Sequence, residues 1–102
     1  MTDSDQDPEL LRAKINQETA QIPWSSLQRF FAQGTAIWVD QGLDLVDVAL
    51  AVAEDSAERV GFWMSEGSVS KVSDTQARDW IQNDAVVWAV VVRPWVLVQE
   101  SE

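Results

Sequence analysis

Hydrophobic residues recur at helical spacing in five segments of the chain. A residue whose side chain can cap a helix precedes each segment, and most segments end at a glycine, at an asparagine or before a proline. The pattern predicts helices at about residues 8–21, 26–33, 45–53, 56–66 and 74–82. The predicted capping residues are Asp7, Ser25, Asp44, Asp55 and Ser73, and the pairs Ser25–Gln28 and Ser73–Gln76 have the spacing of a capping box.

Three further segments are rich in β-branched and aromatic residues, which favours strands at 35–39, 69–72 and 85–99. In the last segment both alternate sets of side chains are apolar, so we expect this strand to be covered on both faces. Pro94 has no amide hydrogen, and it either kinks the strand or places it at an edge of the sheet. The sequence therefore predicts an α+β fold of about five helices packed on a small, three-stranded sheet.

The length of 102 residues is that of one domain. We assign residues 7–100 to a single α+β domain and residues 1–6, which are acidic and polar, to a disordered lead-in. In the middle, a strand, two helices and a short strand follow one another, an order that resembles a winged helix-turn-helix. The would-be recognition helix, 56–66, offers one cation, Arg59, against Glu58 and Glu66, so a protein contact is a better interpretation of it than DNA reading.

Composition narrows the classes of function. The chain has no cysteine and no histidine, which excludes disulfides, thiolate metal sites and the usual nucleophile–base pairs of enzymes. Seventeen acidic and seven basic residues give a net charge of −10, which repels a nucleic-acid backbone. No apolar run is long enough to span a bilayer, and no secretory signal is visible, so we expect a cytoplasmic protein that binds neither nucleic acid nor membrane.

Several sequence blocks resemble the bacterial family called domain of unknown function 2288. The blocks are residues 43–49, the pair Val60 and Trp63 before Gly67, Trp80, and residues 91–99. The similarity covers about residues 9–99, and the Pro-Trp-Val-Leu-Val-Gln block near the end is its most specific part. The resemblance implies a small bacterial cytosolic protein and names no site residue.

Three aspartates, Asp40, Asp44 and Asp47, gather around the predicted start of the third helix. Carboxylate oxygens suit magnesium or calcium. Capping by Asp44 and the interaction of Asp47 with the helix dipole explain the same residues without a metal. We therefore predict no metal and no cofactor, while a minor enzyme that uses Asp40 and Asp44 with Arg93 stays open as an alternative.

Six tryptophans are present, and most of them lie in periodic apolar segments that indicate a core. Trp24 and Trp95 each lie beside a proline at the boundary of an element, so we expect these two to be partly exposed. Because Pro94 favours an edge position, residues 95–99 are expected to form an edge strand, covered either by the first helix or by a second copy of the chain. Trp24, Trp95, Val96 and Leu97 are therefore the candidate interface residues.

The sequence favours an acidic interaction or regulatory module that binds a protein partner or itself. A small-molecule-binding protein or a carboxylate-based minor enzyme is the principal alternative, and a winged-helix nucleic-acid binder is the other. The lack of histidine and cysteine argues against an enzyme.

Overall fold

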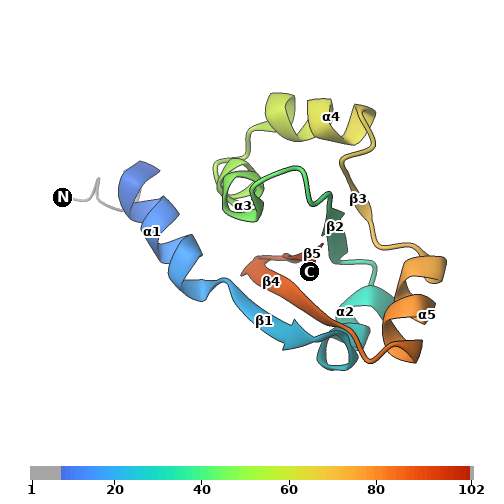
Figure 1. Ribbon diagram of the computed structural model, residues 1–102. Helices are drawn as coiled ribbons and strands as arrows, with labels where there is room; N and C mark the ends of the chain where they lie inside the picture. The colour runs from blue at the N-terminus through green and yellow to red at the C-terminus, as the bar shows by residue number, and fades with distance from the viewer. Residues whose placement is uncertain (1–7, 102) are drawn as a thin grey trace.

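The computed structural model describes residues 8–101, and its centre is a mixed sheet of five strands in the order β1-β4-β5-β2-β3 (Figure 1). The strands are β1 (Ala20–Pro23), β2 (Ala36–Val39), β3 (Val69–Lys71), β4 (Val86–Val92) and β5 (Trp95–Glu100). The helices are α1 (Pro8–Glu18), α2 (Gln28–Ala32), α3 (Leu45–Ala53), α4 (Ala57–Ser65) and α5 (Asp74–Gln82), with a short 3-10 helix, η2 (Trp24–Leu27), before α2. The α+β class is confirmed, but the prediction of three strands is wrong, because the described part of the chain has five.

The predicted strand at 85–99 is a hairpin. β4 and β5 pair in antiparallel fashion from Val87 opposite Glu100 to Val92 opposite Trp95, and Arg93 and Pro94, joined by a cis peptide bond, form the turn. Both strands of the hairpin have apolar residues at both alternate sets of positions, so in the sequence the two strands look like one continuous apolar segment. Pro94 therefore marks a turn and no edge, and β5 is the central strand, paired with β4 on one side and in parallel with β2 on the other.

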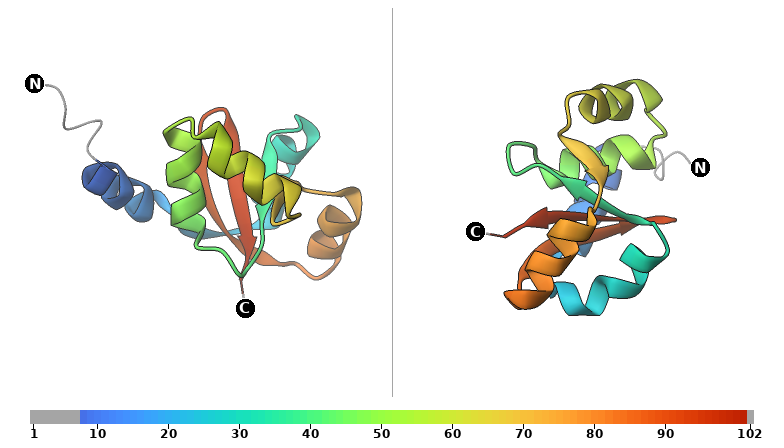
Figure 2. Two further views of the ribbon diagram at one scale, coloured as in Figure 1. Left: turned by 90° about the horizontal axis from the view of Figure 1, so that it is seen from above. Right: turned by 90° about the vertical axis from the view of Figure 1, so that its right-hand side faces the viewer.

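Helices cover the two faces of the sheet (Figure 2, right). Successive side chains of a strand point to opposite faces, so Val96 belongs to one hydrophobic cluster and Leu97 to the other. We call the side covered by α1, α3 and α4, to which Ile37, Val90 and Leu97 point, the α3 face. The opposite side, covered by η2, α2 and α5, is the α5 face. Because β5 serves both clusters, it lies at the centre of the whole molecule.

Local capping signals place two of the five helices, α3 and α5. The Asp44 side chain accepts a hydrogen bond from the Val46 amide at 2.9 Å, and Ser73 and Gln76 form the predicted capping box of α5. The cap predicted at Asp55 is wrong: Asp55 has a positive φ of 60° and forms the turn between α3 and α4, while Ser56 is the N-cap and makes no side-chain cap bond.

The first third of the chain departs most from the prediction. α1 ends at Glu18. Residues 20 and 21, expected at the end of this helix, belong instead to the edge strand β1, which pairs with β4. Ser25 makes no capping box, because it lies inside η2. The predicted cap at Asp7 and the lead-in at 1–6 lie outside the described residues.

The strand–helix–helix–strand order of the middle segment is present as β2, α3, α4 and β3. A winged helix has a β-hairpin, the wing, after its second helix. Here β3 pairs with β2 and is followed by helix α5, so the chain forms no such hairpin at this point. Between residues 8 and 101, no helix is long and apolar enough to cross a membrane.

Candidate functional site

Three of the four predicted interface residues are core residues. Trp24 has an exposed fraction of 0%, Val96 of 2% and Leu97 of 1%. Trp24 packs edge to face on Trp80, with ring centroids 4.9 Å apart. The prediction of an edge strand at residues 95–99 is wrong, because β2 and β4 pair with β5 on its two sides and leave no free edge for a partner.

The acidic residues near the start of α3 are occupied within the chain. The guanidinium of Arg12, from α1, donates hydrogen bonds to the carboxylates of Asp47 and Asp44. The hydrogen bond with Asp47, reinforced by the charges of both carboxylates, raises the pKa of Arg12 above its usual value. Asp40 accepts a hydrogen bond from the Gly42 amide. The Arg12 hydrogen bonds join α1 to α3, and the bond to Gly42 holds the loop after β2. Each of the three aspartates therefore has a structural role.

The proposed acid–base trio does not converge. Asp40 follows Val39, which is paired with Gln99 near the end of β5, whereas Arg93 lies in the turn before β5 begins. The two residues therefore lie at opposite ends of the sheet. Within the part of the chain that the structure describes, no three potential metal ligands gather at one point.

An open apolar cleft of about 280 Å³ lies under α4, on the α3 face of the sheet; we call it the α4 cleft. Its floor is built from side chains that the register places side by side: Ile37 is opposite Lys71 on β3 and opposite Leu97 on β5. Val69 and Trp95, each two residues from one of these, extend the floor on the same face. Two of the predicted interface residues, Trp95 and Leu97, thus line a surface hollow.

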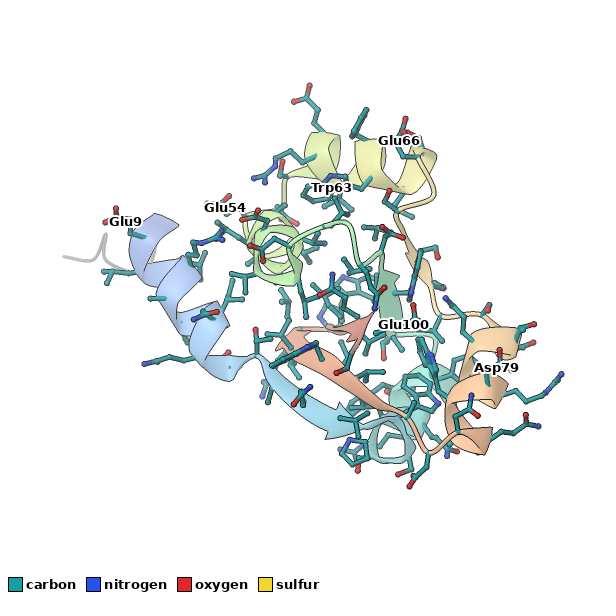
Figure 3. The ribbon with its side chains drawn as sticks, viewed as in Figure 1. Glu9, Glu54, Trp63, Glu66, Asp79 and Glu100 are labelled. Atoms are coloured by element: carbon teal, nitrogen blue, oxygen red, sulfur yellow. The ribbon has the colours of Figure 1, made fainter. Side chains whose placement is uncertain are left out.

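The wall and roof of the α4 cleft come from the α3–α4 pair. Val52 near the end of α3 and Val60 and Met64 on α4 line it. α4 is the most loosely packed of the long helices, since none of its residues is buried and Met64 has an exposed fraction of 56%. Val60 and Trp63 are partly buried, whereas Met64 is mostly exposed. Trp63 does pack against the cluster on the α3 face, and the guanidinium of Arg59 lies over its ring (Figure 3).

Polar groups stand only at the rim of the α4 cleft. They are Asp55 and Ser56 at the α3–α4 turn, and Ser70 and Lys71 on β3. Lys71 makes no ion pair with any residue between 8 and 101. Two acidic residues of the α3–α4 pair do not line the cleft: Glu54 follows α3 and Glu66 follows α4 (Figure 3). An apolar hollow with a polar rim can hold an apolar group and fix the orientation of whatever carries it.

A second hollow lies on the part of the α3 face that no helix covers. Trp88, exposed to 39%, borders it together with Gln21, Gln41 and Gln99. The Gln99 amide already donates to the carbonyls of Asp40 and Leu43, so it is engaged in holding the loop after β2. This hollow is mostly polar and shallow, which makes it a weaker candidate than the α4 cleft.

The α4 cleft was not predicted, because its lining comes from five elements: β2, α3, α4, β3 and β5. One signal was present. Segment 60–64 contains four large apolar residues, Val60, Phe62, Trp63 and Met64. At helical spacing their side chains lie on more than one face of the helix, so they cannot all be buried against the core. Phe62 is accordingly exposed to 61%.

Comparisons with known proteins place the chain in a family. The solution NMR structure of PA1075 from Pseudomonas aeruginosa is similar at 50% sequence identity, with a TM-score of 0.81, over 90% of this chain and 85% of that chain. No curated protein matches the sequence. The family model described as "Protein of unknown function (DUF2288)" matches residues 10–100. The chain therefore belongs to the DUF2288 family, as the blocks around Gly67 and Pro94 indicated.

Proposed function

We propose that this protein is a binding module that takes an apolar side chain of another protein into the α4 cleft. The observation that carries the proposal is the cleft itself: about 280 Å³ of open space with an apolar lining on a protein whose surface is otherwise strongly acidic. An apolar anchor residue that enters such a hollow is the usual centre of a protein interface.

The exposed residues of α4 support the same function. Phe62 and Met64 are each more than half exposed, and Met64 also lines the cleft. Methionine adapts its shape to different apolar partners, and exposed aromatic residues are enriched at interfaces. Since α4 buries none of its residues completely, it can shift to admit a side chain without dismantling the core.

A displayed library of random twelve-residue peptides tests the proposal. Peptides selected on the native protein are assayed by fluorescence polarisation against Val60→Asp, which places a charge in the cleft, and against Val86→Asp, a matched change at an exposed position outside it. We expect binding to weaken at least about tenfold in Val60→Asp and to stay unchanged in Val86→Asp. Circular dichroism confirms that both variants are folded. Peptides that bind both variants equally, or a library that yields no binder, would contradict the proposal.

A small organic acid is a second candidate occupant, and Lys71 is the observation that favours it. The Lys71 side chain lines the rim of an apolar hollow and makes no salt bridge among the described residues. Octanoate, which has an apolar tail and one carboxylate, is the test ligand. Saturable NMR shifts at Ile37 and Val60 that disappear in Lys71→Ala would favour this candidate over a protein partner.

The cellular setting belongs to the same proposal. We propose that the protein is bacterial and cytoplasmic, which agrees with the absence of cysteine and with the family resemblance. We also propose that it acts through a partner and not as an enzyme, which agrees with the absence of histidine and cysteine.

A further inference from the structure

We propose that the partner binds as an extended segment that adds a sixth strand to the free edge of β3 and places an apolar side chain in the α4 cleft beside that edge. The inference rests on the proposed function, and it adds the conformation of the partner, the strand that it pairs with and the charge that it carries.

The backbone of β3 offers free hydrogen-bonding groups at the edge of the sheet. In an antiparallel ladder, alternate residues bond to the neighbouring strand and the others point outward. The Asp40 amide donates to the Ser68 carbonyl, and the Val72 amide donates to the Ala36 carbonyl, so the even-numbered residues of this segment face β2. The amides and carbonyls of Val69 and Lys71 therefore point away from the sheet. The Lys71 carbonyl also accepts a long hydrogen bond from the Ser70 hydroxyl, at 3.3 Å, so the two amides and the Val69 carbonyl are the groups left for a new strand. In the right-hand view of Figure 2, β3 lies in the foreground with no other element in front of it.

The other edge of the sheet is protected in a way that β3 is not. On β1, the Trp24 amide donates to the Ala85 carbonyl, so Gln21 and Pro23 are the residues that point outward. Pro23 has no amide hydrogen to offer an added strand. β3 contains no proline, and its outward residues both have a donor and an acceptor. Of the two edges, β3 is the one equipped to pair.

The cleft lies where an added strand would deliver a side chain. Val69 and Lys71 point to the α3 face and line the α4 cleft. Residues directly opposite each other in an antiparallel pair point to the same face. The partner residues opposite Val69 and Lys71 would therefore point toward α4, and the residue between them would point to the other face. An apolar residue opposite Val69 enters the hollow next to Val60 and Met64.

Charges at the two ends of β3 specify the chemistry of the partner. Glu66, just before the strand, and Asp74, just after it, are both exposed. Across 54–74 the acidic residues number five (Glu54, Asp55, Glu58, Glu66 and Asp74) and the basic residues two (Arg59 and Lys71). A segment with lysine or arginine on both sides of its apolar residue complements this pattern.

The same charges argue against a second copy of this chain. Antiparallel pairing of two β3 strands about Ser70 brings the Glu66 end of one copy to the Asp74 end of the other. Like charges then meet at both ends of the short pairing, and each copy carries a net charge of −10. The partner is therefore a different, basic segment.

The test uses the peptides from the displayed library whose binding is lost in Val60→Asp. They are assayed against Lys71→Pro, which removes one outward amide while the ladder to β2 through Ser70 and Val72 stays intact, and against Lys71→Ala, which controls for the side chain. We expect these peptides to alternate, with an apolar residue between basic ones. We expect binding to Lys71→Pro to be at least about tenfold weaker than binding to Lys71→Ala, because both variants lack the lysine side chain and they differ in the outward amide.

Each other outcome overturns a stated part of the inference. Peptides that depend on Val60 but bind Lys71→Pro normally would refute strand addition and leave the proposed function in place. Peptides that are independent of Val60 refute the proposed function itself. A native dimer that dissociates in Lys71→Pro would identify a second copy as the occupant and refute the basic partner. If Lys71→Pro does not fold, N-methylation of the peptide amide opposite Val69 replaces it, with N-methylation of the next amide as the control, and an equal effect of the two refutes strand addition.

Discussion

Replacing Trp24 by alanine tests most directly whether β1 and η2 form part of the core. The Trp24 side chain is fully buried, and its ring packs edge to face on Trp80 at 4.9 Å and on Phe31 at 6.1 Å between centroids. Removal of a buried tryptophan costs about 3–5 kcal/mol of unfolding free energy, because transfer from water is lost and a cavity remains. A domain of this size has about 5–15 kcal/mol in total, so Trp24→Ala leaves the protein marginally stable.

Urea unfolding followed by circular dichroism measures the effect. With a denaturant slope of about 1.5 kcal/mol per M, a loss of 3–5 kcal/mol lowers the urea midpoint by about 2–3 M. Trp24→Phe keeps the aromatic contacts and removes an indole N–H for which the described residues provide no acceptor, so we expect a loss of only about 1–2 kcal/mol.

Trp88→Ala is the matched control. Trp88 is exposed to 39% on the uncovered part of the sheet, so its removal should cost about 1 kcal/mol or less. If Trp24→Ala and Trp88→Ala shift the urea midpoint equally, the burial of Trp24 and the placement of η2 against α5 are wrong.

Three further predictions concern the helix cap, metals and DNA. Asp44→Ala should lower the free energy of unfolding by about 1 kcal/mol, because the Val46 amide loses its acceptor; Asp44→Asn keeps an acceptor, so urea unfolding should give a smaller loss, and equal losses would count against capping. EDTA should leave the melting temperature unchanged, because Asp44 and Asp47 are bound by Arg12; a fall of several degrees that magnesium or calcium reverses would revive a metal site. Duplex DNA at physiological salt should not bind, because a net charge of −10 releases no counterions from the phosphates, and a salt-sensitive gel shift at micromolar protein would disprove this.

The sequence by itself determined the elements whose signals are local. Asp44 caps α3, and Ser73 with Gln76 caps α5, because a side chain that bonds an amide two or three residues away needs no help from the rest of the fold. Gly34 and Gly67 end α2 and α4 with a φ of 78°, a conformation that glycine adopts without strain. Strand β2 followed from a short β-branched and aromatic run.

Tertiary structure decided which apolar residues lie at an edge, at the centre or in a cleft. The run at 85–99 is apolar at both alternate sets of positions because β4 and β5 each contribute side chains to both hydrophobic clusters, although Trp88 and Val91 stay exposed. This uniform apolar pattern concealed the turn at Pro94. β1 has only four residues, with a proline among them, and it is a strand because β4 offers it an edge. Strand order depends on contacts between residues far apart in sequence, such as Ile37 opposite Leu97. Local sequence patterns carry no information about such contacts.

The candidate site was even less accessible from the sequence than the fold. Val52, Val60, Val69 and Leu97 are ordinary core residues in any local pattern, and only the packing of α4 against the edge of the sheet leaves space between them. Trp95 was singled out because it lies next to Pro94, but it reaches the α4 cleft because the register of β5 turns it to the α3 face. A cleft is the space that remains after elements pack, so it is set by the shapes of distant segments and not by the residue types of any one of them.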